Sequence, residues 1–232
     1  MNKYISLLLA VPILAACNNE GTTNPREEII QQEEESTSIT ASEFWDWFES
    51  KSDDYYHLEE NTEELFNDLS DQLFLYDPGL TFVFSTIKEN GRREFVVSAD
   101  GIKSSFPAVE SLVDKAPELE QWEIIAFRPR VGTEYAVQFN DLELKPEDVF
   151  FIAGEDEEHD AVGLDIYIRD YDENDDRFIS AFFLLLDNAV GEYDSETKIG
   201  YLDFHPIPND TNAILLQPWS EVTETVDNFY NN

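Results

Sequence analysis

The stretch LTFVFSTIKENGRREFVVSA, residues 80–99, decides the fold class of this chain. Two segments rich in β-branched and aromatic residues, 80–86 and 92–99, lie on either side of Asn90-Gly91. Asn-Gly between two such segments is the strongest short-range signal for a β-hairpin. We therefore expect two antiparallel strands here, and the fold class depends on what surrounds them.

Two helices are predicted before this hairpin. Phe44, Trp47 and Phe48 fall at i, i+3 and i+4, and Ser42 is placed to cap the helix that they define. A stripe of leucines at helical spacing predicts a second helix over residues 62–76, which the following Asp-Pro-Gly ends. The sequence thus favours a helical pair at the start of the folded region.

Strands and helices alternate after the hairpin. Further helices are expected over residues 106–116, 178–190 and 220–230, the last capped by Ser220. Further strands are expected over residues 122–127, 135–139, 148–153, 162–169 and 199–204. Because hairpins outnumber βαβ units, we predict an α+β fold with a mixed or mainly antiparallel sheet packed with helices.

Composition limits the classes of function. The 232 residues include 51 acidic and 14 basic side chains, so the formal net charge is -37, and 42% of residues are hydrophobic. That apolar content excludes global disorder, and the charge excludes a nucleic-acid binder that works by neutralising phosphates. A single cysteine excludes an intramolecular disulfide and a thiolate metal cluster.

The first residues read as a targeting segment. One basic residue, Lys3, precedes an apolar run of residues 4–16, which is too short to span a bilayer. The run ends in Leu14-Ala15-Ala16-Cys17, which resembles the lipobox of bacterial lipoproteins. A buried helix that happens to end in cysteine is the alternative interpretation.

The lipobox resemblance implies a location. It implies that residues 1–16 are a signal peptide, cleaved between Ala16 and Cys17, and that Cys17 carries fatty acyl chains such as palmitate. More than one acyl chain gives stable attachment to a membrane. We therefore expect a lipid-anchored protein of the cell envelope. Asn18 is not the aspartate that retains lipoproteins in the inner membrane, which implies the outer membrane if the organism is Gram-negative.

A polar segment separates this cysteine from the folded region. Residues 18–42 contain no aromatic side chain and consist mainly of polar and acidic residues. Such a segment buries too little apolar surface to offset its ordering entropy. We interpret residues 17–42 as the lipidated cysteine with a flexible acidic tether, and residues 43–232 as a single domain. A boundary at Lys145-Pro146 is the alternative, and no internal repeat is visible.

Three blocks of the folded region resemble an uncharacterised bacterial protein family of unknown function. They are FWDWF at residues 44–48, REFVVSADGI and the residues that follow it at 93–130, and LLLDNAVGEYD with TKIG at 184–200. The resemblance spans most of residues 43–204. It implies a discrete domain and assigns no activity, cofactor or site residue.

Motifs for catalysis or metal binding are not found. The sequence holds no G-x-S-x-G, no H-E-x-x-H and no phosphate loop, and its three histidines are far apart. Residues 170–181 alternate acidic residues as in a calcium loop, but Asp175 stands where glycine is needed and Ala181 where glutamate is needed. We expect no catalytic residue, metal site or cofactor, and solvated loops at residues 155–160 and 170–176. A looser calcium site in either segment is the alternative interpretation.

One set of residues is a candidate binding site. Arg128 and Arg130 flank a proline at the end of a predicted strand, and Glu192, Tyr193 and Asp194 follow a predicted buried helix. Together they form a candidate pocket for a ligand or partner. Structural pairing of the two arginines with carboxylates is the favoured alternative, and a helix end followed by a turn accounts for the three residues after Gly191.

The acidity points to a basic partner. Complementary charge steers association and makes it salt-sensitive. We expect a non-enzymatic, lipid-anchored interaction module that binds a basic protein, with membrane contact through acylated Cys17 and no nucleic acid. The alternatives are an immunity-type protein that neutralises a toxin and a hydrolase-like enzyme with an unrecognised site. The same acidity is also typical of proteins adapted to a salty habitat.

Overall fold

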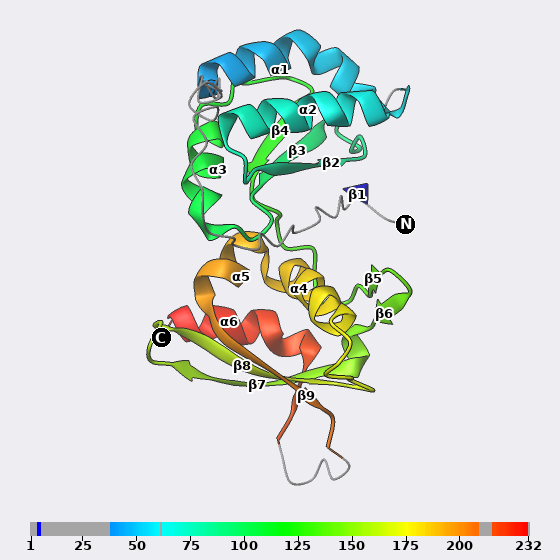
Figure 1. Ribbon diagram of the computed structural model, residues 1–232, viewed down its shortest axis with the longest axis vertical. Helices are drawn as coiled ribbons and strands as arrows, with labels where there is room; N and C mark the ends of the chain where they lie inside the picture. Colours follow the sequence, from blue (N-terminus) through cyan, green and yellow to red (C-terminus); the bar gives the residue numbers. More distant parts are fainter. Residues whose placement is uncertain (1–3, 6–37, 61, 209–214, 232) are drawn as a thin grey trace, which may run out of the picture.

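The computed structural model describes residues 4–5, 38–60, 62–208 and 215–231 (Figure 1). The helices are α1 (Ala41–Tyr56), α2 (Thr62–Tyr76), α3 (Phe106–Val113), α4 (Arg177–Val190), α5 (Glu192–Lys198) and α6 (Val222–Asn231). The strands are β1 (Tyr4–Ile5), β2 (Thr81–Ser85), β3 (Arg93–Ser98), β4 (Trp122–Ala126), β5 (Val137–Phe139), β6 (Leu142–Leu144), β7 (Val149–Asp156), β8 (Ala161–Ile168), β9 (Ile199–Pro206) and β10 (Gln217–Pro218). The α+β class and the N-terminal helical pair are confirmed.

The first sheet has the strand order β1-β2-β3-β4. The Asn-Gly turn joins β2 and β3 as the predicted antiparallel hairpin, and β4 pairs with β3 in parallel after the crossover through α3. Helices α1 and α2 lie across one face of this sheet (Figure 1). The hydrophobic core between them draws its residues from positions 41–127 and is rich in aromatic rings.

The second sheet has the order β10-β7-β8-β9. Strands β7 and β8 form a long antiparallel hairpin, and β9 pairs with β8 in parallel after α4 and α5. The side chains of Val162, Leu164, Ile166 and Ile168 point inward to a second hydrophobic core, which α4 and α6 complete. Alternate positions of β8 and β9 point to the opposite, solvent-facing side of the sheet.

The two sheets share one order of elements. Each consists of an antiparallel hairpin, then a helical crossover, then a parallel strand at the sheet edge. The first core ends at Phe127 and the second begins at Val137. We call residues 38–127 the N-terminal lobe and residues 137–231 the C-terminal lobe. Whether these lobes unfold as one domain stays a prediction.

Several expected elements differ in detail. The strands expected in one sheet form three sheets among the described residues, because β2–β4 and β7–β9 belong to different sheets and β5 and β6 form a separate two-stranded hairpin. The second of these strands was not predicted, nor was β10. Residues 192–198 form α5, where a turn was expected, and Ser220 lies in a 3₁₀ turn before α6 and does not cap it.

The start of α1 corrects the expected end of the tether. Thr40, not Ser42, is the N-cap: its side chain accepts a hydrogen bond from the Glu43 amide, and Glu43 Oε2 accepts one from the Thr40 amide at 2.8 Å. Ile39 N donates to the carbonyl of Leu75 at 3.1 Å, and Ala41 is buried. Residues 38–42 therefore belong to the folded part.

The predicted lipidation site lies outside the described residues, as do residues 6–37. Tyr4–Ile5, within the predicted signal peptide, pairs antiparallel with β2, so its removal would leave β2 as the sheet edge. Across the described ranges, no helix is both long enough and apolar enough to cross a membrane.

The corrected boundary predicts unequal effects of two deletions. Removal of residues 18–37 should leave the melting temperature unchanged, because these residues have little apolar surface to bury. Removal of residues 18–42 also deletes the Thr40 cap and the Ile39–Leu75 bond, and should cost about 1–3 kcal/mol. Thermal unfolding followed by circular dichroism compares the two. Equal melting temperatures would contradict the assignment of Thr40 as the cap.

Candidate functional site

Glu192 joins the two lobes through a buried carboxylate. It is the first residue of α5, and its exposed fraction is 0%. Oε1 accepts a hydrogen bond from Ala99 N at 2.9 Å, and Oε2 accepts one from Arg128 N at 3.0 Å. Glu192 N donates in turn to the carbonyl of Arg128 at 3.0 Å. The carboxylate thus binds main-chain amides that follow β3 and β4, and it links the lobes directly.

Arg128 places its positively charged guanidinium beside this carboxylate and binds two further carboxylates. Its guanidinium donates to Asp100 Oδ1 at 2.8 Å and to Asp187 Oδ2 at 2.7 Å, and its Nε lies 3.9 Å from Glu192 Oε2. Burial by itself would lower the pKa of Arg128, but Glu192 and Asp187 outweigh that effect and raise the pKa above its ordinary value. Arg128 therefore stays charged and holds carboxylates from both lobes.

Arg130 makes a second set of contacts, all with residues of the C-terminal lobe. Its guanidinium donates to both oxygens of Asp227 at 2.8 Å, to Asp194 Oδ2 at 2.6 Å and to the carbonyl of Val190 at 2.8 Å. The hydrogen bond to Asp227 is the main reason why the pKa of Arg130 is raised, and the same bond lowers the pKa of Asp227. Arg130 thereby ties the segment that follows β4 to α5 and α6.

The backbone at this junction is specialised. Gly191 has φ +83°, and a Cβ there would lie 3.3 Å from Arg130 N and 3.4 Å from the Arg128 carbonyl. Glycine separates α4 from α5 because it alone adopts this conformation without strain. Phe127 has φ +63° and packs with Phe106 and with the half-exposed Tyr193, whose ring centroid lies 5.1 Å from that of Phe127.

The structure brings together Arg128, Arg130, Glu192 and Asp194. Tyr193 lies beside them, and its ring packs against those of Phe106 and Phe127. Each guanidinium faces carboxylates of the chain itself. None of the three described cavities is lined by these five residues. This geometry fits the structural alternative, in which the arginines serve as internal counter-ions. A ligand role for this site stays a prediction.

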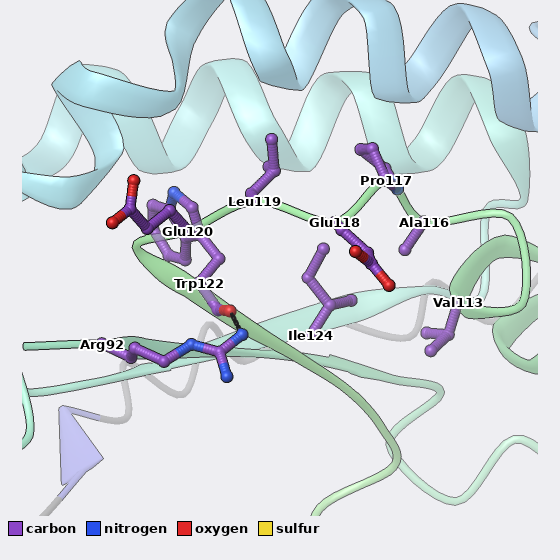
Figure 2. A pocket seen from close by; sticks show the side chains of 9 residues that line it. All are labelled: Arg92, Val113, Ala116, Pro117, Glu118, Leu119, Glu120, Trp122 and Ile124. Atoms are coloured by element: carbon purple, nitrogen blue, oxygen red, sulfur yellow. Dashed lines mark hydrogen bonds between the residues drawn. The ribbon is translucent and has the colours of Figure 1, made fainter. Parts of the chain in front are cut away.

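The largest described cavity lies elsewhere, between β4 and the loop after α3. It has a volume of about 740 Å³ and is lined by Arg92, Val113, Ala116, Pro117, Glu118, Leu119, Glu120, Trp122 and Ile124. In Figure 2, the Arg92 side chain reaches the main chain of Trp122, to whose carbonyl it donates a hydrogen bond. The lining residues of this cavity include no imidazole, thiol or hydroxyl, and its carboxylates are those of Glu118 and Glu120.

A second cavity, of about 460 Å³, lies where the end of α1 meets the start of α2. It is lined by Lys51, Asp53, Asp54, His57, Glu64, Leu65 and Asp68. Four carboxylates face one lysine and one histidine in this lining. We call these seven residues the acidic groove. Its charge suits a cationic group.

Of the two segments predicted as solvated acidic loops, residues 170–176 form turns, whereas residues 155 and 156 belong to β7 and Asp156 is buried. At the end of β7, the Asp156 carboxylate contacts His159 Nδ1 in the following turn at 2.9 Å, and this bond lowers the pKa of Asp156. Between β8 and α4, Asp172 Oδ1 accepts from the main-chain and side-chain nitrogens of Asn174 at 3.0 Å each. The carboxylates of Asp156 and Asp172 are thus held by contacts within their own segments.

One cluster was missed from the sequence. Asp165, Asp203 and His205 present donor atoms that all lie within 4.8 Å of one another on the outer face of β8 and β9. The spacing Asp203-x-His205 was only a partial signal, because alternate residues of a strand share a face but the predicted strand ended at residue 204, one residue before His205. The third residue, Asp165, could not be found without the strand pairing.

Comparison with protein-family models, with curated protein sequences and with solved structures finds no match to this chain. The family resemblance of residues 44–48, 93–130 and 184–200 therefore stays an expectation. Any proposal on function has to rest on the geometry and charge of the chain itself.

Proposed function

We propose that this protein is a lipid-anchored, non-enzymatic interaction module of the cell envelope that binds a basic protein partner through the acidic face of α1 and α2. The observation that carries this proposal is the charge of the helical pair. α1 and α2 hold nine acidic residues and one lysine. The acidic residues are Glu43, Asp46, Glu49, Asp53, Asp54, Glu63, Glu64, Asp68 and Asp71.

The distribution of basic residues supports this choice of face. At least eight lysines and arginines elsewhere in the described chain form ion pairs, among them Arg93, Arg128, Arg130 and Arg177. Their charge is offset locally. On α1 and α2, a single lysine accompanies nine carboxylates, so this face carries a strong negative potential toward solvent.

The acidic groove gives the face a shape as well as a charge. Asp53, Asp54 and Asp68 are exposed at its rim, and buried Leu65 forms part of its floor. A lysine or arginine side chain has an apolar stem and a charged head, which match this floor and rim. We therefore propose that basic side chains of the partner enter the groove.

The proposed anchor explains why recruitment by charge would be useful. A body of net charge -37 is repelled by an anionic membrane surface. Acylated Cys17 would hold the protein at the membrane, and the segment after it would let the acidic face point away from the lipids. Partner binding then takes place beside the membrane and not on it.

A comparison of three forms of the full chain tests the proposal. In the first variant, Asp53→Asn, Asp54→Asn and Asp68→Asn neutralise the groove. In the matched control, Glu155→Gln, Glu157→Gln and Glu158→Gln neutralise an exposed turn of the C-terminal lobe. Both variants change the net charge by the same three units. The measurement is the amount of basic protein that the anchored chain retains from membrane extracts at low and at high salt.

We expect the groove variant to retain about tenfold less partner at low salt, and the control to behave as the unmodified chain. High salt should release the partner from the unmodified chain. In a parallel arm, Cys17→Ser should move the protein from the membrane fraction to the soluble fraction. Equal losses in both triple variants, or retention insensitive to salt, would refute docking at this groove.

A further inference from the structure

The outer face of the second sheet carries an imidazole between two carboxylates. Asp165 on β8 pairs in register with Asp203 on β9, and Tyr167 pairs with His205. All four side chains point away from the core, because they alternate with Leu164, Ile166 and Phe204, which pack inward. Two neighbouring strands of a sheet thus bring three potential metal ligands to one point.

The spacing of the donor atoms is informative. His205 Nε2 lies 3.5 Å from Asp165 Oδ1 and 3.5 Å from Asp203 Oδ2. These distances exceed the usual 2.7–3.2 Å of an N–H···O hydrogen bond. A tetrahedral zinc ion with bonds of about 2.0–2.1 Å places its ligand atoms about 3.3–3.5 Å apart. The two distances therefore match ligands around a common ion, and all three donor atoms lie within 4.8 Å of one another.

The surroundings hold the imidazole in place. The rings of Tyr167 and His205 stack with centroids 4.9 Å apart and planes 30° apart. This contact fixes the plane of the His205 ring, and the strand pairing fixes the two aspartates. Asp165 and His205 are partly exposed and Asp203 is exposed, so the side away from the sheet is open to solvent. An ion bound here would keep open positions for water or for another ligand.

We propose that Asp165, Asp203 and His205 form a binding site for a divalent transition-metal ion, with Zn²⁺ as the best match. Imidazole and carboxylate are both ordinary ligands of Zn²⁺, whereas Ca²⁺ and Mg²⁺ take oxygen ligands and make no use of His205. Three protein ligands with open positions are the arrangement of exchangeable or reactive zinc sites and not of closed structural ones.

The three histidines of the chain allow a direct test. His57 and His159 lie on other parts of the surface, and His159 also contacts an aspartate, Asp156, at 2.9 Å. The full chain, labelled at histidine, is titrated with Zn²⁺ in excess Mg²⁺ at about 0.15 M ionic strength, which limits general binding to carboxylates. Imidazole resonances are assigned with His57→Gln, His159→Gln and His205→Gln.

We expect the first equivalent of Zn²⁺ to shift the His205 resonances and to leave those of His57 and His159 in place. Calorimetry should show affinity at least about tenfold weaker for His205→Gln and for Asp203→Asn. His159→Gln is the matched control and should bind as the unmodified chain does. Circular dichroism confirms folding of each variant, and these exposed substitutions should not disturb it.

Two results would overturn the proposal. One is a first equivalent that shifts His57 or His159 and not His205. The other is Zn²⁺ affinity that is unchanged in both His205→Gln and Asp203→Asn. Either would mean that the three side chains form an ordinary surface ion pair.

Discussion

Glu192→Gln should lower the free energy of unfolding by about 3–5 kcal/mol, because it removes one partner from a buried, hydrogen-bonded charge pair. The amide keeps one oxygen, but its NH₂ group would face the main-chain N–H of Arg128, a second donor, at the position that Oε2 now occupies. The Arg128 side chain would also lose a counter-ion. The loss is large because Glu192 is fully buried, so water cannot replace the hydrogen bonds that the substitution removes.

Asp100→Asn provides the matched control. Asp100 also binds the Arg128 guanidinium, at 2.8 Å, but its side chain is mostly exposed. An exposed ion pair contributes about 0–1 kcal/mol, so this variant should be nearly neutral. Urea unfolding gives the free energies. Hydrogen exchange followed by mass spectrometry reports residues 41–127 and 137–226 separately. Equal losses of unfolding free energy for the two variants would show that the burial of Glu192 does not add to its contribution to stability.

The second large effect is expected at the centre of the N-terminal core. Phe48 is completely buried, and its ring lies 4.8 Å from that of Phe95, 5.3 Å from Trp122 and 5.4 Å from Tyr55, measured between centroids. Phe48→Ala should therefore cost about 3–5 kcal/mol through lost burial and the cavity left behind. Urea unfolding followed by tryptophan fluorescence suits this measurement, since Trp45 and Trp122 contact the same ring.

Phe74→Ala is the control for this substitution. Phe74 lies on α2 and is 63% exposed. The same atoms are deleted, but most of the Phe74 ring is already exposed and no buried cavity forms. The free energy of unfolding should therefore change by no more than about 0.5 kcal/mol. A Phe48 variant as stable as the Phe74 variant would contradict the described packing of α1 against the first sheet.

Local sequence signals predicted local structure well. The bounds of α2 agree with the expectation, because a leucine stripe, acidic residues in its first turn and Asp-Pro-Gly after it all indicate the same helix. The β2–β3 hairpin follows from Asn90-Gly91 for a similar reason. Where two residues could do the same task, prediction failed: Ser42 and Thr40 are both good caps, and only Thr40 has Glu43 at the reciprocal position.

Long-range arrangement was beyond the sequence signals. Strand patterns do not state which strands pair, so one sheet was expected where β2–β4 and β7–β9 belong to different sheets. Helix α5 was taken for a turn because residues 192–198 have no apolar stripe. It is stabilised instead by contacts such as that of Ser195 Oγ with Asp187 Oδ1 at 2.8 Å.

At the candidate site, too, the sequence indicated the residues involved but not their long-range contacts. The rarity of basic residues in this chain drew attention to Arg128 and Arg130, and the polar residues after the predicted buried helix, Glu192, Tyr193 and Asp194, were the candidate partners. The sequence placed Glu192 near them only as a hypothesis. Nothing in it indicated that Glu192 is fully buried, or that Asp187, Asp100 and Asp227 complete the charge balance. The contacts of Arg128 with Asp100, Asp187 and Glu192 arise where the lobes meet.

The Glu192 contact also sets an order of events during protein synthesis. The residues of the first hydrophobic core are complete once Phe127 has emerged from the ribosome. The amide of Arg128 receives its carboxylate from a residue 64 positions later, which at about 5–20 residues per second is a delay of about 3–13 s. For that interval, the nascent N-terminal half has its hydrophobic core but not the acceptor for these amides. Its final stability is therefore reached only when the second half arrives.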